Sequence, residues 1–141
     1  MGNKPYAMEW MRFAYRSLRT AQKLFEVEHY MDIIGAEIQQ SVEKSLKALL
    51  AFHNRMIPRT HELVLLLAYI DKLPDVDLNF REEELDLLDR ISLYYKFERY
   101  PNPNYFVPDA QEVKNSLLFA EALFDDIVGI LQIDASLFEE D

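Results

Sequence analysis

The 141-residue sequence contains no cysteine, and this absence excludes disulfide bonds and thiolate chemistry. No apolar run approaches the roughly 18 residues that a membrane-spanning helix needs. The N-terminus lacks the basic, apolar and small-residue regions of a signal peptide. We therefore expect a single-domain cytoplasmic protein spanning residues 1–141, with no membrane segment.

Histidine is scarce too, with only His29, His53 and His61 in the chain. There is no HExxH zinc motif, no pair of Glu-x-x-His motifs as in di-iron sites, and no glycine-rich phosphate loop. Arg55 and His61 match a pattern of arginine, five residues and histidine, but they flank the Pro58 turn and do not share a helix face. We predict no metal and no cofactor.

Charge is unevenly distributed around the net value of −10. Residues 1–60 carry a net +3 and residues 61–141 a net −13. Non-specific binding of nucleic acid by the whole surface is disfavoured, since an acidic face repels phosphate. A local basic stripe on the first helix (Arg12, Arg16, Arg19 and Lys23) remains, either as a solvated face or as a contact surface for phosphate or an acidic protein.

Three glycines and the spacing of the apolar residues predict an almost entirely helical protein. We expect five helices joined by short turns, in an all-α, up-and-down bundle. Three prolines make the segment 100–108 non-helical, and the acidic tail is expected to be frayed. The expected helices cover approximately residues 5–28, 30–54, 61–73, 81–98 and 109–131.

The second expected helix is apolar over more than half of its circumference. Such a helix lies at the centre of a bundle or is shared with a partner subunit. After it, Pro58 makes a turn, and Thr60 is predicted to cap the third helix with His61 at the first helical position. A helix start carries a partial positive charge that favours anionic ligands.

The fourth expected helix ends in a cluster of aromatic and basic residues, which includes Tyr94, Tyr95, Arg99 and Tyr100. Arg99 suits a helix C-terminus, where a cation is stabilised. Arginine beside aromatic rings is also how proteins hold a base or a phosphate. The sequence leaves both interpretations open.

Several of these motifs, taken in order, resemble the HEPN family (higher eukaryotes and prokaryotes nucleotide-binding domain). A Glu-Lys-x-Leu-Lys run and a Pro-x-Thr-His-x-Leu helix entry match the family pattern, and Arg99-Tyr100-Pro101 resembles the Arg-Tyr-Pro of many small prokaryotic members. The resemblance extends over approximately residues 10–131. The matching positions in the run and the entry are Gln40, Glu43, Lys44, Leu46, Lys47, Leu50, Pro58, Thr60, His61 and Leu63.

The resemblance implies a helical bundle that is usually a homodimer, often encoded beside a minimal nucleotidyltransferase in a toxin–antitoxin module. Some members are metal-independent RNases that use an Arg-x(4–6)-His motif on a late helix. Here Arg99 occupies the arginine position, and no histidine follows it. The expected general acid or base is therefore missing, and we do not predict a catalytic residue.

Our first hypothesis is thus a HEPN homodimer that binds a nucleotide or a nucleotidyltransferase partner. The ligand-binding residues that we predict are Lys44, Lys47, His61, Arg99 and Tyr100. One alternative is an RNase toxin that uses Arg99, and another is a helical scaffold without a ligand. Lys44 and Lys47 could instead simply pair with Glu37 and Glu43 on the surface.

Overall fold

The computed structural model describes residues 2–104 and 106–140, and that part of the chain contains helices and no strand. The predicted all-α bundle of five α-helices is confirmed. A short 3-10 helix, η1, follows them. The elements are α1 (Lys4–Glu26), α2 (Met31–Phe52), α3 (Leu63–Ile70), α4 (Glu82–Arg99), α5 (Ala110–Leu131) and η1 (Ala135–Glu140).

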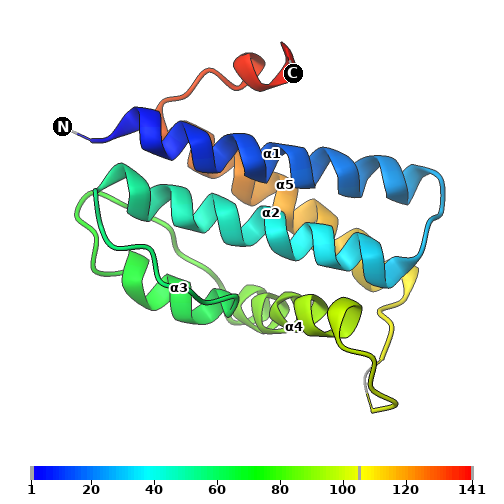
Figure 1. The fold of residues 1–141 in the computed structure, drawn as a ribbon. Helices are drawn as coiled ribbons and strands as arrows, with labels where there is room; N and C mark the ends of the chain where they lie inside the picture. The colour runs from blue at the N-terminus through cyan, green and yellow to red at the C-terminus, as the bar shows by residue number, and fades with distance from the viewer. Residues whose placement is uncertain (1, 105, 141) are drawn as a thin grey trace.

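Helix α2 lies at the centre of the bundle (Figure 1). It runs antiparallel to α1, packs on α5 behind it, and contacts α3 and α4 along its other side. Nearly all of its side chains from Ile34 to Ala51 are buried, polar ones included. The sequence left two explanations for the apolar circumference of this helix, burial at the centre of the bundle or contact with a partner subunit. Burial within its own bundle accounts for it.

Small residues on α2 permit this close packing. Gly35 is an example, because a Cβ atom placed there would lie 3.1 Å from the ring of Tyr94 on α4. The Tyr94 hydroxyl donates to the carboxylate of Glu112 on α5 and lies 3.2 Å from Ser116 Oγ. Burial, followed by the neighbouring Glu112 carboxylate, raises the pKa of Tyr94 far above its usual value. These contacts lock α4 to both α2 and α5.

The proline-rich loop between α4 and α5 is held by Arg90. Its guanidinium is 2.7 Å from Glu112 and stacks over the Phe106 ring, 3.9 Å from the centroid. The described parts of this loop, residues 100–104 and 106–108, are non-helical as predicted. No helix in residues 2–104 and 106–140 has the length and apolar character needed to traverse a bilayer.

Two sequence-based predictions were wrong. Helix α3 begins at Leu63, so His61 lies in an extended approach to the helix instead of at its first position. The C-terminal tail is not frayed within the described residues, because Phe138 is fully buried and stacks on Tyr15 with ring centroids 5.6 Å apart. One large aromatic ring supplies enough contact area to hold η1 against α1.

Candidate functional site

The segment before α3 delivers His61 to the side of α2. Thr60 does accept a backbone hydrogen bond, from Glu62 N at 3.1 Å, but this bond closes a turn ahead of the helix. The N–H of Leu63 donates to Ser92 Oγ on α4 at 2.9 Å, which fixes the start of α3. Gln39 on α2 donates to the backbone oxygen of His61 at 3.1 Å. His61 is thus held from both neighbouring helices.

A buried carboxylate, Glu43 on α2, orients the His61 ring. It accepts hydrogen bonds from Gln39 Nε2 at 2.9 Å, Lys47 Nζ at 2.9 Å and His61 Nδ1 at 2.8 Å. Burial by itself raises the pKa of Glu43, but these three hydrogen bonds outweigh it and the pKa lies below its usual value. Glu43 is therefore ionised at neutral pH.

The charge on Glu43 determines which histidine nitrogen is available to a ligand. An ionised carboxylate only accepts hydrogen bonds, so Nδ1 of His61 must carry the hydrogen. In the neutral ring Nε2 then has a free lone pair. The side chain of His61 is 46% exposed, compared with 5% for Glu43. The arrangement is a histidine whose Nδ1 is held by Glu43, with Nε2 left to accept a hydrogen bond.

Tyr95 on α4 connects His61 to Arg99. The His61 and Tyr95 rings stack with centroids 3.7 Å apart and planes tilted by 17°, and the Arg99 guanidinium carbon lies 4.2 Å from the Tyr95 centroid. Two planar groups at such short distances cannot share one ring face, so they occupy opposite faces of Tyr95. Arg99 also contacts Glu98 at 3.3 Å and keeps 41% of its side chain exposed.

The two predicted lysines differ in their surroundings. Lys47 is 7% exposed, pairs with Glu43 and lies 5.7 Å from the Trp10 ring centroid, so its contacts are those of a buried structural ion pair. Lys44 is only partly buried and lies over the Phe13 ring at 5.9 Å. Within residues 2–104 and 106–139, no carboxylate forms an ion pair with Lys44.

The pKa of Lys44 also shows what surrounds it. Burial lowers this pKa, the charges of Glu43 and Glu37 act in the opposite direction, and the positive charges of Lys47 and Arg99 lower it further. The effect of Arg99 is the smallest of these, and it acts as a charge at a distance and not as a contact partner of Lys44. We call the surface formed by Lys44, His61, Tyr95 and Arg99 the α2–α4 face.

The five predicted ligand residues thus separate into three groups. Lys44, His61 and Arg99 belong to the α2–α4 face, and Lys47 lies beneath it. Tyr100 is the C-cap residue of α4, is 58% exposed, and has no ring contact with the described part of the chain. Our prediction did not include Tyr95 or Glu43. Tyr95 lies four residues before Arg99, and Glu43 lies four residues before Lys47. This spacing, which brings two side chains together on one face of a helix, was the signal available in the sequence.

The remaining polar features do not form a second site of this kind. Among the described residues, no three His, Cys, Asp or Glu side chains gather as metal ligands do. The basic stripe of α1 is engaged within its own chain. Arg12 lies over Phe138, Arg16 over Phe13, Arg19 donates to Gln22, and Lys23 pairs with Glu26.

Comparison with known proteins gives a family and a fold. The model of the HEPN domain matches residues 7–131. The crystal structure of TT1696 from Thermus thermophilus is similar, with a TM-score of 0.69 and 25% identity over 88% of this chain and 97% of that one. ST0689, described as an archaeal HEPN homologue, has a TM-score of 0.65 and 21% identity over 89% and 97%. None of the curated proteins matches this chain.

Proposed function

This chain belongs to the HEPN domain family, and on that premise we propose that it binds a nucleotide through its phosphates at the α2–α4 face. The main support is that two cationic side chains remain accessible there: Lys44 is only partly buried and forms no ion pair among the described residues, and the side chain of Arg99 is 41% exposed. Lysine and arginine are the usual phosphate-binding side chains. His61 adds a ring nitrogen that lies on the far side of Tyr95 from Arg99.

The charge of the whole molecule makes this local arrangement more selective. The chain carries a net −10, so phosphate is repelled from most of the surface. Two cations on one face therefore provide a local site for an anion on a molecule whose overall charge is negative. Because the side chains of Arg99 and His61 remain 41% and 46% exposed, a phosphate can reach them without any rearrangement of the core.

Calorimetric titration with ATP and with inorganic tripolyphosphate tests the proposal. We expect saturable binding of both, and a rise of the melting temperature with ATP concentration. Lys44→Gln and Arg99→Gln should each weaken binding by roughly 10- to 100-fold, the range for a lost charge-assisted hydrogen bond. Lys114→Gln, at an exposed position on α5, is the charge-matched control. If the titrations give no heat and the melting temperature does not rise, the interpretation of the chain as a helical scaffold without a ligand is favoured.

The RNase alternative is favoured by one specific observation, the Glu43-held His61. In such a reaction Nε2 of His61 takes the proton of a 2′-hydroxyl, the 2′-oxygen attacks the phosphorus, and the bond to the 5′-oxygen breaks as that oxygen takes a proton from water. Arg99 would neutralise the charge that develops on the phosphate. Cleavage of RNA in the presence of EDTA, abolished by both His61→Ala and Arg99→Ala, is the expected result. Intact RNA with excess protein excludes this alternative.

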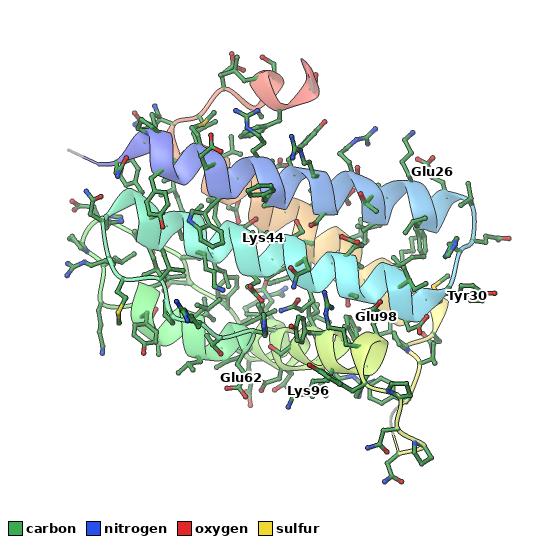
Figure 2. All side chains as sticks on the ribbon, in the orientation of Figure 1. Glu26, Tyr30, Lys44, Glu62, Lys96 and Glu98 are labelled. Atoms are coloured by element: carbon green, nitrogen blue, oxygen red, sulfur yellow. The ribbon has the colours of Figure 1, made fainter. Side chains whose placement is uncertain are left out.

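We also propose that the protein is a homodimer. The surface of α3 and α4 supports this, because Val64, Leu65, Tyr69 and Leu93 are each 37–43% exposed and α3 contains no charged residue. An exposed apolar face of this kind suits a second copy of the chain. Figure 2 labels Glu62 and Lys96 at its edge. Sedimentation of the wild type should give a mass of twice 16.7 kDa, and the Leu65→Glu variant should sediment as the 16.7 kDa monomer.

A minimal nucleotidyltransferase is the partner that we propose, within a module of the toxin–antitoxin type. The support is membership of the HEPN family alone. An adjacent gene for such an enzyme, and its co-purification with this protein, is the expected finding. Growth arrest on expression of this chain, relieved by the partner, would assign the toxin role to it.

A further inference from the structure

A cavity between the first half of α1 and the middle of α2 lies beside the α2–α4 face. Its volume is about 430 Å³, and its lining consists of Tyr6, Glu9, Trp10, Phe13 and Lys44. A volume of this size accommodates one small organic ligand. Figure 2 labels Lys44 midway along α2, on the side of the bundle where α1 and α2 lie next to each other. Lys44 belongs both to this cavity and to the α2–α4 face.

Three aromatic rings of α1 line the cavity at helical spacing, and of these Trp10 also packs against the core. The core stripe of α1 uses Ala7, Met11 and Ala14 on the adjacent face. Tyr6 and Phe13 are 42% and 47% exposed, and Trp10 is partly buried. Exposed rings around a hollow provide stacking surfaces for another planar ring, in addition to the burial that any apolar ligand would gain there.

The two charged residues of the lining specify what the planar ring must carry. Lys44 forms no ion pair with the described residues, so an anionic group attached to the ring system would be its first close partner. The Glu9 carboxylate is exposed and accepts hydrogen bonds from an N–H edge. A planar ring with N–H donors and a linked anion is the chemistry of an amino-bearing nucleobase with its phosphate.

We infer that this cavity receives the base of a purine nucleotide with an exocyclic amino group, whose phosphate then meets Lys44 and Arg99. The inference rests on the nucleotide-binding function proposed above and adds the position of the base. Tyr95 cannot take that role, because its two ring faces are occupied by His61 and Arg99. The rings of Trp10 and Phe13 supply the stacking surface instead, since the cations nearest to them lie farther from the ring centroids, at 5.7 Å for Lys47 from Trp10 and 5.6 Å for Arg16 from Phe13.

Trp10 is the only tryptophan of the chain, so its fluorescence reports on this cavity directly. AMP should quench its emission saturably, adenosine should do so at higher concentration, and ribose 5-phosphate should have no effect. Phe13→Leu should weaken AMP binding by roughly 5- to 150-fold, the range for one lost base–aromatic stack. Phe13 is 47% exposed, so the core of the variant stays intact.

Two control measurements separate the parts of the inference. Tyr30→Leu removes an exposed aromatic ring at the start of α2, outside both the cavity and the proposed dimer surface, and should leave AMP binding unchanged. Purine riboside lacks the amino group and should bind several-fold more weakly than adenosine, and Glu9→Gln should reduce this preference. Equal effects of Phe13→Leu and Tyr30→Leu on AMP binding would overturn the inference.

The outcomes distinguish failure of this inference from failure of the proposed function. One outcome is that AMP and tripolyphosphate both give binding heat while AMP leaves Trp10 emission unchanged and binds Phe13→Leu as tightly as the wild type. In that case phosphate binds at the α2–α4 face and the base lies elsewhere. If neither compound gives heat, the proposed function itself is wrong. A Trp10 emission that changes on dilution of the protein alone would show that a second copy fills the cavity, and the base-binding role would be overturned.

Discussion

Replacing Glu43 by glutamine removes the one buried carboxylate that holds Lys47 and His61 together. In Glu43→Gln, the ammonium of Lys47 stays in a position where its side chain is only 7% exposed, without an anionic partner. Breaking one side of a buried ion pair costs about 3–5 kcal/mol of unfolding free energy. For a chain of this size, about 3 °C of melting temperature corresponds to each kcal/mol, so we expect a loss of roughly 9–15 °C.

The same variant has an expected pH dependence. The pKa of Glu43 in the folded protein is below its ordinary value of 4.5. The stabilisation from this carboxylate is therefore complete above pH 4.5 and is lost as the pH falls through the folded-state pKa. The stability difference between the wild type and Glu43→Gln should be constant near neutral pH and shrink in acid.

Urea unfolding followed by circular dichroism measures both effects. Glu37→Gln, on the same helix and without an ion pair among the described residues, is the matched control. The double variant Glu43→Gln, Lys47→Met should recover most of the loss, because it removes the stranded charge. Equal stability of the wild type and Glu43→Gln at pH 7, or a difference that persists unchanged below pH 4.5, would refute this account of the ion pair.

Three further substitutions test the packing of the bundle. Gly35→Ala should cost about 1–3 kcal/mol, since its Cβ would lie 3.1 Å from the buried Tyr94 ring, which cannot retreat. Gly129→Ala, at an exposed position of α5, should instead stabilise the protein by about 0.5–1 kcal/mol, because no atom lies within 4 Å of the new Cβ. Urea unfolding of the two variants side by side checks these opposite signs, and a shared sign would contradict the packing described. Phe138→Ala should cost about 3–5 kcal/mol, and a thermal melt unchanged from the wild type would mean that η1 contributes nothing to stability.

The sequence predicted the helices well because their signals are local. Apolar spacing, a low glycine content and the prolines at 101, 103 and 108 act within a few residues, and they marked five helices with ends close to those observed. Where a signal depended on distant packing, the prediction was wrong. Thr60 looked like a helix cap, but Gln39 and Ser92 hold the approach to α3 so that the helix begins at Leu63.

The sequence by itself determined the all-α bundle and identified Lys44, His61 and Arg99 as residues of interest. Only the tertiary structure decided how they relate to one another. Eighteen residues separate Glu43 from His61, and the loop conformation alone brings them to 2.8 Å. The stacking of His61 and Arg99 on Tyr95 likewise depends on where α4 packs against α2. Helical periodicity fixes which face a side chain occupies, but contact between faces is set by the packing of the whole bundle.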